Sequence, residues 1–144
     1  MGALSAPCLA QLPVYNDHAK EFATITDGIK SVPRVGAPGN VIAGGPDSFC
    51  IVAGAVGRVL VPVVAAARSG RGLVLAFGHS SYLEKPAVSQ ADVLRLIRNA
   101  IVFTKLQQRE TRVAVYRSPA LASLLSEEGV LVKEESRTYA KISI

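Results

Sequence analysis

The stretch from Phe49 to Phe77, FCIVAGAVGRVLVPVVAAARSGRGLVLAF, decides the expected fold. It holds three short apolar runs separated by two glycine-containing loops: Phe49–Ala53, Gly54–Gly57, Val59–Ala67, Ser69–Gly72 and Leu73–Phe77. Loops of this length join antiparallel strands. Upstream, turn residues surround one more short run, Asn40–Ala43, which we interpret as a strand. The pattern predicts a β-meander over residues 40–78.

Two segments precede the meander. Residues 1–16 contain two prolines and no clear hydrophobic period, which predicts an irregular lead-in. From residue 17 to residue 30, three apolar side chains recur at helical spacing: Phe22, Ile25 and Ile29. We therefore expect a short helix there, and a single α/β domain over residues 17–144.

The clearest helix signal follows the meander. Ser89 can cap the N–H of Asp92 while the Asp92 carboxylate reaches back, as in a capping box. An apolar stripe follows: Val93, Leu94, Ile97, Ala100, Ile101 and Thr104. The other side is polar: Arg95, Arg98, Asn99 and Lys105. The pattern predicts an amphipathic helix over residues 89–106 that packs one face on the sheet.

A βαβ unit is predicted over residues 111–135. Arg112–Tyr116 alternates like a short strand, and Ser118 followed by Pro119 is typical of a helix N-cap with proline at the first helical position. Leucines line the helix until a glycine ends it, and Val130–Lys133 is a second strand. Such a unit implies a parallel strand pair joined by a right-handed crossover.

Together these segments predict an α/β fold, in which a β-hairpin or meander lead-in is followed by the start of a Rossmann-like parallel sheet. A parallel sheet of two strands leaves an edge exposed, and another element begins at Lys141–Ile144. We therefore expect the sheet to be incomplete. Either the chain is a fragment of a longer protein, or a partner covers the edge, as in a homodimer formed through it.

Composition restricts the function classes. With 144 residues, 49% of them hydrophobic and 19% charged, the chain fits one folded domain. Its net charge of +5 is compatible with nucleic acid, anionic lipid or an acidic protein surface. The basic residues are scattered and no aromatic residues interleave with them, so nucleic-acid binding is not expected. Neither a signal peptide nor a membrane-spanning stretch is recognisable, so we expect a cytoplasmic protein.

The sequence contains no recognisable catalytic or metal-binding motif. Its two histidines, His18 and His79, do not form a His-Glu-x-x-His pattern. Cys50 with His79 is the one conceivable nucleophile and base, but Cys50 lies inside an apolar run, whereas reactive cysteines favour loops or helix N-termini. The glycines around Arg71 suit a hairpin rather than a phosphate loop. We expect no enzyme activity, no metal and no cofactor.

A ligand-binding hypothesis comes from topology. Open α/β sheets bind ligands beyond the carboxyl ends of their strands. Two predicted loops place polar side chains at such positions, and these are our candidate ligand-binding residues: His79, Ser80, Tyr82, Arg117 and Ser118. A small ligand or a glycan would bind there.

The segment Val63–Leu83, VVAAARSGRGLVLAFGHSSYL, resembles the AA-x-x-G-x-G-R-x-x-V-x-x-H-x-x-Y-L region of the TRP-channel-associated factor family and its bacterial relatives. Further similarity lies at four places, so that the resemblance covers roughly residues 20–135: Pro38-Gly39, Pro46–Phe49, Asn99-Ala100 and Val115–Val130. The chain has Leu73 where the family has an arginine, and Ser69 where an aromatic residue is common.

The resemblance implies a class I glutamine-amidotransferase-like α/β fold without the amidotransferase nucleophile. Longer members of the family carry an enhancin-like metallopeptidase domain downstream, which this sequence does not contain. Vertebrate members are described as binding and regulating a cold-sensing TRP channel at the plasma membrane. The implied function is a non-catalytic regulatory or interaction module that binds a membrane channel at the inner face of the plasma membrane.

Two alternatives stay open at this point. The chain can be an accessory or remnant domain of an enhancin-like metallopeptidase or of an amidotransferase-like hydrolase. It can also be a small-ligand or glycan-binding module that uses the loops named above.

Overall fold

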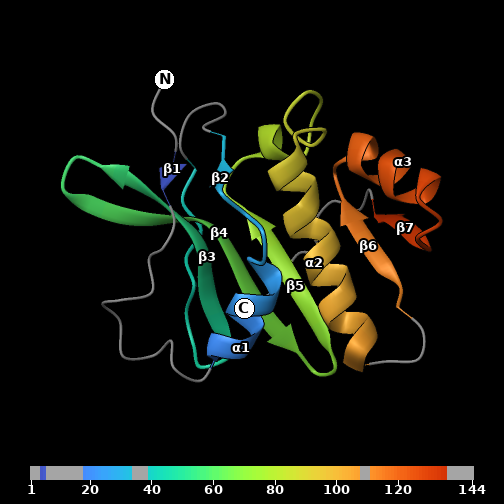
Figure 1. The fold of residues 1–144 in the computed structure, drawn as a ribbon, viewed down its shortest axis with the longest axis horizontal. Helices are drawn as coiled ribbons and strands as arrows, with labels where there is room; N and C mark the ends of the chain where they lie inside the picture. Colours follow the sequence, from blue (N-terminus) through green and yellow to red (C-terminus); the bar gives the residue numbers. More distant parts are fainter. Residues whose placement is uncertain (1–3, 6–17, 34–38, 108–110, 136–144) are drawn as a thin grey trace, which may run out of the picture.

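Three α-helices and three small sheets make up the described part of the chain (Figure 1). The structure is a computed structural model that describes residues 4–5, 18–33, 39–107 and 111–135. Its elements follow in this order: β1 (Leu4–Ser5), α1 (Ala19–Ile25), β2 (Ser31–Val32), β3 (Ser48–Val56), β4 (Val59–Ser69), β5 (Gly72–Phe77), the short 3-10 helix η3 (Ser80–Tyr82), α2 (Ala91–Gln107), β6 (Val113–Tyr116), α3 (Pro119–Glu127) and β7 (Val132–Glu135).

The predicted meander is confirmed for its three longer strands. β3, β4 and β5 pair antiparallel in that order, and Gly57 and Gly70 supply the positive φ angles, 62° and 57°, of the two tight turns. The strand predicted at Asn40–Ala43 is wrong. The segment is a coil, and its Val41 N–H donates to the Pro62 carbonyl of β4 at 2.9 Å. Because Pro62 has no N–H to donate in return, a ladder of β hydrogen bonds does not continue there.

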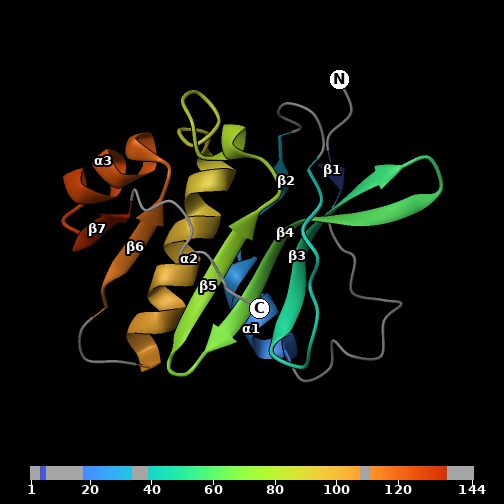
Figure 2. The same ribbon diagram turned by 180° about the vertical axis from the view of Figure 1, so that it is seen from behind.

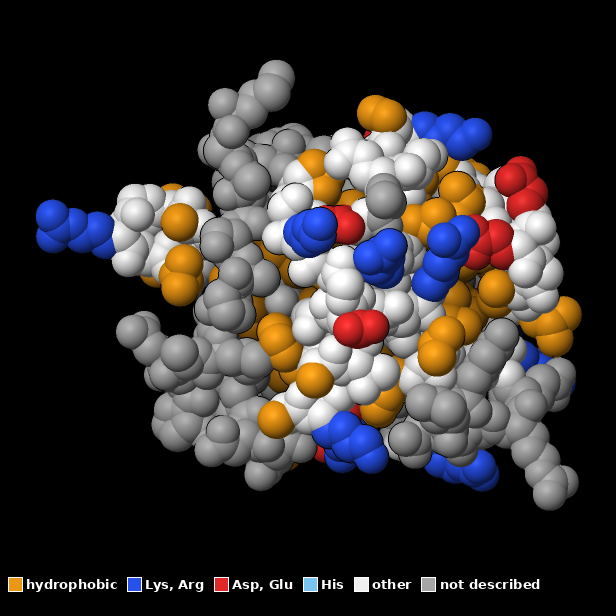
Figure 3. Space-filling view, in the orientation of Figure 1, with side chains coloured by type: hydrophobic (Ala, Val, Ile, Leu, Met, Phe, Trp, Pro, Cys, Tyr) orange, Lys and Arg blue, Asp and Glu red, His pale blue; other side chains and the backbone are white. Residues whose placement is uncertain are grey.

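The β3–β4 hairpin extends beyond the sheet as an arm, which we define as residues 54–61 (Figure 1). β5 pairs with β4 only from Val64 onward, so no third strand of the described residues lies beside the arm. Three aliphatic side chains of the arm are more than half exposed: Val56, Val59 and Leu60. The space-filling view accordingly shows hydrophobic patches on the arm and a basic side chain at its end (Figure 3).

The N-terminal elements differ from the prediction. β1 pairs antiparallel with β2, so the irregular lead-in predicted for residues 1–16 is wrong at these two positions, and the rest of that segment lies outside the described residues. The helix predicted from residue 17 to residue 30 is the shorter α1, and residue 17 also lies outside the described part. α1 ends early because Gly28, with a φ of 69°, turns the chain out of the helix.

α2 lies on the same face of the β3–β5 sheet as α1 (Figures 1 and 2). Its inner side is buried: Val93, Leu96, Ile97, Ala100 and Ile101. The helix confirms the predicted amphipathic segment, but the predicted capping box is wrong. The Ser89 N–H donates instead to the Pro86 carbonyl at 3.2 Å, and the Asp92 carboxylate is engaged elsewhere.

The polar edge of α2 binds the backbone that follows α1. Three side chains make these hydrogen bonds: Asp92 Oδ2 accepts from the N–H groups of Lys30 (3.2 Å) and Ser31 (2.9 Å), Arg95 Nη1 donates to the Gly28 carbonyl (2.9 Å), and Asn99 Nδ2 donates to the carbonyls of Ile25 (3.0 Å) and Asp27 (2.9 Å). The last carbonyls of a helix have no partner within the helix. Asn99, which we predicted to point outward, therefore supplies the donors that the end of α1 lacks.

The predicted βαβ unit is confirmed. β6 and β7 pair in parallel, and α3 between them begins with Pro119 after the N-cap Ser118. β7 begins later than the predicted strand Val130–Lys133. The cause is that the Val130 N–H still bonds to the Leu125 carbonyl at 3.0 Å and so belongs to the end of α3.

The core lies between the helices and the sheets. Its largest fully buried side chains come from α1, β3, β4, α2, α3 and the loop before α2: Phe49, Ile25, Ile51, Leu96, Leu125, Val64, Val88 and Val93. The described residues thus form a mixed α/β fold with a three-stranded antiparallel sheet and a two-stranded parallel one. In the part that the structure describes, no helix has the length and apolar character needed to cross a bilayer.

The Asn99 contacts predict a stability effect. Asn99→Ala leaves two backbone carbonyls without their side-chain donor, so we expect it to lower the free energy of unfolding by about 1–3 kcal/mol. Val102→Ala, on the exposed outer side of the same helix, is the matched control and is expected to change it by less than about 0.5 kcal/mol. Urea unfolding followed by circular dichroism measures both, and equal values for the two variants would contradict the assigned role.

α2 and α3 are tied at the surface by an ion pair. Arg98 donates from Nε to Glu128 Oε2 at 3.0 Å and from Nη2 to Oε1. These hydrogen bonds lower the pKa of the Glu128 carboxyl below its ordinary value of 4.5, although burial opposes part of the effect. A carboxyl whose pKa is lower in the folded state stabilises the fold above its unfolded pKa, and this contribution disappears as the pH falls through the folded pKa.

The ion pair predicts a pH dependence of stability. We expect Glu128→Gln to cost about 0.5 kcal/mol at neutral pH, the usual contribution of a surface pair, and to cost nothing once the pH lies below the lowered pKa of Glu128. Unfolding free energies of the wild type and of the variant, measured from pH 7 down to pH 3, test this. A difference that does not change with pH would show that the charge of Glu128 is not the cause.

Candidate functional site

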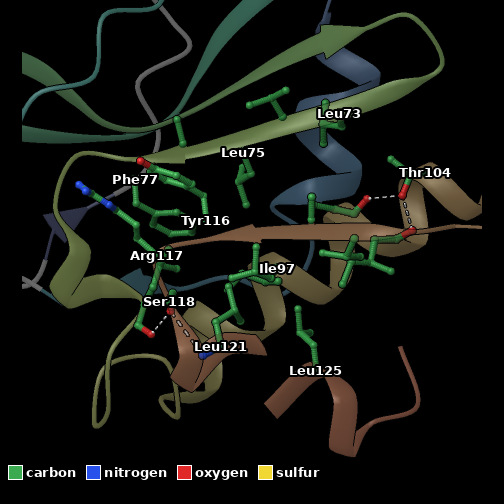
Figure 4. Close-up of a pocket in the computed structure, with 18 of the residues that line it drawn as sticks. Leu73, Leu75, Phe77, Ile97, Thr104, Tyr116, Arg117, Ser118, Leu121 and Leu125 are labelled. Carbon is green, nitrogen blue, oxygen red and sulfur yellow. Dashed lines mark hydrogen bonds between the residues drawn. The ribbon is translucent and has the colours of Figure 1, made fainter. Parts of the chain in front are cut away.

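A groove lies between β5 and β6 (Figure 4). Its volume is about 840 Å³. Residues 72–77 of β5 line it without a gap, and so do residues 111–118, which include β6. Side chains alternate along a strand, so contact with every residue of two strands means that the strands turn their backbone edges toward the groove.

The two strands stand apart. β5 and β6 belong to separate sheets, and most of their Cα atoms are more than 8 Å from one another. Directly paired strands are about 4.8 Å apart, so strands that flank one intervening strand are about 9.6 Å apart. The two strands also run in the same direction, as Figure 1 shows. The separation of β5 and β6 is therefore larger than that of directly paired strands.

One wall of the groove is the backbone edge of β5 that pairs with no other described strand. The Gly78 N–H donates to the Val63 carbonyl at 2.8 Å. This bond and the register of the pair show which residues of β5 turn their N–H and C=O groups toward β4. In an antiparallel ladder, every second residue bonds to one neighbour and the residues between them face the other way. The N–H and C=O groups of Leu73, Leu75 and Phe77 therefore face the groove.

The opposite wall is the corresponding edge of β6. The Val113 N–H donates to the Leu131 carbonyl at 3.0 Å, and Val113 lies opposite Val132 in the parallel pair. Every second residue of a parallel ladder bonds to the same neighbour. The N–H and C=O groups of Ala114 and Tyr116 therefore face the groove, which thus has hydrogen-bonding groups on both walls.

Helices cover one side of the groove with apolar side chains (Figure 4). From α2 and α3 these are Ile97, Ile101, Leu121 and Leu125. Leu73, Leu75 and Phe77 of β5 and Val113 of β6 pack toward the same core. On the other side, Val74 and Tyr116 are 53% and 43% exposed. An occupant would therefore have one face buried against the helices and one face in solvent.

Polar groups lie at the two ends of the groove. His79, Ser80, Arg117 and Ser118, four of the five candidate residues, line it where β5 and β6 end. His79 Nδ1 accepts from the Ser81 N–H at 3.2 Å, so that Nε2 carries the proton and can donate to an occupant. At the opposite end, the Thr111 hydroxyl is buried and has no hydrogen-bond partner among the described residues.

The structure gives Ser118 a different role from the predicted one. Its hydroxyl donates to the Leu83 carbonyl at 2.8 Å and accepts from the Leu121 N–H at 3.4 Å, and the residue is buried. Ser118 thus caps α3 and ties the loop after η3 to it. Both hydrogen bonds serve the fold, and together they hold the His79 loop beside the end of β6.

Arg117 has a φ of 54° at the turn from β6 into α3. Left-handed residues at strand-to-helix turns occur at nucleophile elbows of hydrolases, but arginine is not a nucleophile. Its guanidinium lies over the Tyr116 ring, with Cζ at 5.4 Å from the ring centroid, and it is exposed at the end of the groove. The residue can anchor an anionic group there rather than attack a substrate.

The fifth candidate residue, Tyr82, does not line the groove. It is 3% exposed, and its ring packs on Phe77 with 6.1 Å between the ring centroids. The position that the sequence suggested for ligand contact therefore belongs to the core. Its burial follows from η3, a single turn that no sequence pattern predicted.

The remaining residues whose side chains could act as a base, a nucleophile or a metal ligand lie away from the groove. His18 stacks on Phe49 with 4.6 Å between ring centroids, and its Nε2 donates to the Pro46 carbonyl at 2.6 Å. Cys50 is buried in β3, opposite Ala65 of β4. Among the residues that the structure describes, no three His, Cys, Asp or Glu side chains gather into a metal site.

Sequence reasoning located the ends of the groove but missed the groove itself. The apolar run Leu73–Phe77 predicted a strand but gave no sign that one of its edges faces a groove. That β5 and β6 stand apart has no signature in the sequence, because it depends on how α2 packs beneath them.

Comparison with known proteins gives no identification. No protein-family model, no curated protein and no solved structure matches this chain. The resemblance to TRP-channel-associated factors therefore stays a prediction, and the assignment of the site rests on its geometry.

The backbone crossing that holds the His79 loop predicts a second stability effect. A Cβ atom added at Gly78 would lie 2.0 Å from the Gly39 carbonyl oxygen, whereas one added at Gly44 would meet nothing within 4 Å. We expect Gly78→Ala to lower the free energy of unfolding by about 1–3 kcal/mol, the usual cost of overpacking. Gly44→Ala is the matched control. Chemical denaturation of both variants is the measurement, and equal stabilities would show that the backbones do not cross this closely.

Proposed function

We propose that this chain is a non-catalytic interaction module that binds an extended segment of a partner protein as a strand between β5 and β6. The observation that carries the proposal is the pair of strand edges, each without a partner among the described strands, that face one groove over an apolar floor. Addition of a strand to an exposed sheet edge is a recurring mode of peptide recognition. Here the added strand could pair with β5 on one side and with β6 on the other.

The energetics favour a polypeptide over other occupants. Backbone groups on both walls would each gain a hydrogen bond, with a net contribution of about 1 kcal/mol per bond. Every second side chain of the partner would be buried against Ile97 and Leu121, at roughly 25 cal/mol for each Å² removed from water. The hydrogen bonds provide affinity for any extended segment, while the apolar floor selects one with alternating hydrophobic residues.

The resemblance supplies a biological context for this proposal. We propose a regulatory role of the channel-associated-factor type, in which the partner segment belongs to the cytoplasmic part of a membrane channel. With the partner strand in place, the sheet would run from β3 through β5 and the added strand to β6 and β7. Only the β6–β7 part of that sheet is parallel, as in the Rossmann-like sheet that we predicted.

A small ligand or glycan is the second candidate for the groove. The volume of about 840 Å³ lies within the usual range of roughly 300–1,000 Å³ for small-molecule sites, and His79 and Arg117 at one end would bind an anionic group. Such a ligand would not bond along the whole of both walls. The amides of Leu73 and Leu75 would then exchange with solvent as fast as in the unliganded protein.

Peptide display tests the proposal. We expect random eight-residue peptides selected on the purified chain to share an alternating apolar pattern and to protect the amides of Leu73, Leu75 and Phe77 from hydrogen exchange. Ala114→Trp, which fills the open side of the groove, should weaken a selected peptide at least about tenfold, or about 1.4 kcal/mol.

The matched control is Val102→Trp, on the solvent side of α2, which should leave the peptide affinity within about twofold of the wild type, or about 0.4 kcal/mol. Selection of no peptide above background, or equal binding to the Ala114→Trp variant, would count against the groove as the binding site.

A further inference from the structure

We propose that the arm, residues 54–61, binds the surface of an anionic phospholipid bilayer and inserts its end among the headgroups. The arm lies apart from the groove between β5 and β6 in both ribbon views (Figures 1 and 2). The inference therefore goes beyond the proposed strand-binding function and does not depend on it. It gives the chain a second contact surface, for a lipid instead of a polypeptide.

The shape of the arm suits shallow insertion. It projects from the molecule as a two-stranded hairpin (Figure 1), and residues 55–60 are all exposed. From Gly54 to Gly57 it is about 10 Å long at the usual rise of a β-strand. Helices that lie in a membrane interface bury their apolar side chains about 5–10 Å deep. The end of the arm can reach that depth while the β3–β5 sheet stays outside the bilayer.

Both faces of the arm are apolar. Val56 lies directly opposite Val59 on one face, and Ala55 lies opposite Leu60 on the other. Val56, Val59 and Leu60 are 53%, 62% and 55% exposed. A groove on a protein would cover one face of a hairpin and leave the other in water, whereas a bilayer surrounds an inserted end on every side. Apolar side chains on both faces therefore favour a lipid surface over a protein partner.

The charge of the arm complements anionic headgroups. Arg58, in the turn, is the only charged residue of the arm, and Figure 3 shows a basic side chain at its end. An arginine can bury its aliphatic stem while its guanidinium stays at the polar surface, where it can donate two parallel hydrogen bonds to a phosphate. The whole chain has a net charge of +5, so a negatively charged leaflet would attract it.

The backbone limits how deep the arm can go. β5 pairs with β4 only from Val64 onward, so the outer edges of the arm pair with no third strand among the described residues. The N–H and C=O groups along such an edge need water or headgroups, because hydrocarbon offers them no hydrogen bonds. The arm would therefore enter the headgroup layer and the upper part of the acyl chains, and it would attach reversibly.

Co-sedimentation with vesicles tests the inference. We expect the full chain to bind vesicles of phosphatidylcholine with phosphatidylserine more tightly than vesicles of phosphatidylcholine alone. Val59→Ser combined with Leu60→Ser removes an apolar side chain from each face, and should weaken binding to the anionic vesicles at least about tenfold, or about 1.4 kcal/mol.

The matched control is Val102→Ser combined with Leu131→Ser. These two residues are 51% and 60% exposed and lie outside the arm, so this variant should stay within about twofold of the wild type. Circular dichroism melting establishes that each variant is folded, and Leu60→Ser alone replaces the arm variant if that one is not. No sedimentation of the wild type with anionic vesicles, or an equal loss in the two double variants, would overturn the inference.

A charge variant tests the role of Arg58. Arg58→Gln should weaken binding to anionic vesicles about fivefold, or about 1 kcal/mol, and leave binding to phosphatidylcholine alone unchanged. Lys20→Gln removes the same charge from an exposed position of α1 and should cost less than about twofold, because the attraction falls off within a Debye length of the lipid surface. Equal losses in the two variants would show that net charge, and not the arm, binds the vesicles.

Tryptophan fluorescence gives an independent readout. The sequence contains no tryptophan, so Leu60→Trp places a single reporter in the arm. With anionic vesicles its emission should shift to shorter wavelength and be quenched by brominated lipid, whereas the emission of Val102→Trp should not change. A shift that occurs without vesicles, together with a dimer mass by light scattering, would overturn the inference in favour of a second copy of the chain.

The two proposals fail separately. The variant with serine at positions 59 and 60 should bind a selected peptide as the wild type does, since the arm does not line the groove. Ala114→Trp should in turn bind vesicles as the wild type does. Loss of both activities in either variant would show that one surface serves both and would overturn the assignment of lipid binding to the arm.

Discussion

The packing of α2 is the constraint on which the rest of the structure depends. Its buried side, around Leu96, lies against the core, while Asp92, Arg95 and Asn99 on its polar edge hold the backbone that joins α1 to β2. The same helix connects β5 to β6 and lies under the space between them (Figure 4). By fixing the N-terminal segment on one side and the two strands on the other, α2 sets both the core and the width of the groove.

Unpaired backbone groups give that groove its chemical character. A buried N–H or C=O without a partner costs free energy comparable to a lost hydrogen bond, and an exposed strand edge attracts another strand. β5 and β6 each pair on one edge and turn the other toward the same apolar space. A polypeptide can bond to both edges along its whole length, and for this reason it is the occupant that we propose.

Local sequence patterns predicted which helices and strands form better than they predicted which groups hydrogen-bond to one another. The glycine turns of the meander and the Ser118-Pro119 start of α3 are local features, and the structure confirms them. The errors arose where a distant group competed with a local one. Asp92 bonds to Lys30 and Ser31 instead of capping its own helix, and the strand predicted before β3 fails because its neighbour across the sheet is Pro62.

The sequence by itself determined the class of fold, because hydrophobic period and turn chemistry act within a few residues of one another. It also located the loops that hold His79 and Arg117. Only the tertiary structure decided that Tyr82 belongs to the core and that Ser118 is occupied with the fold. It alone decided the separation of β5 and β6, because the distance between two strands depends on the side-chain volumes packed beneath them, and those come from helices remote in the chain.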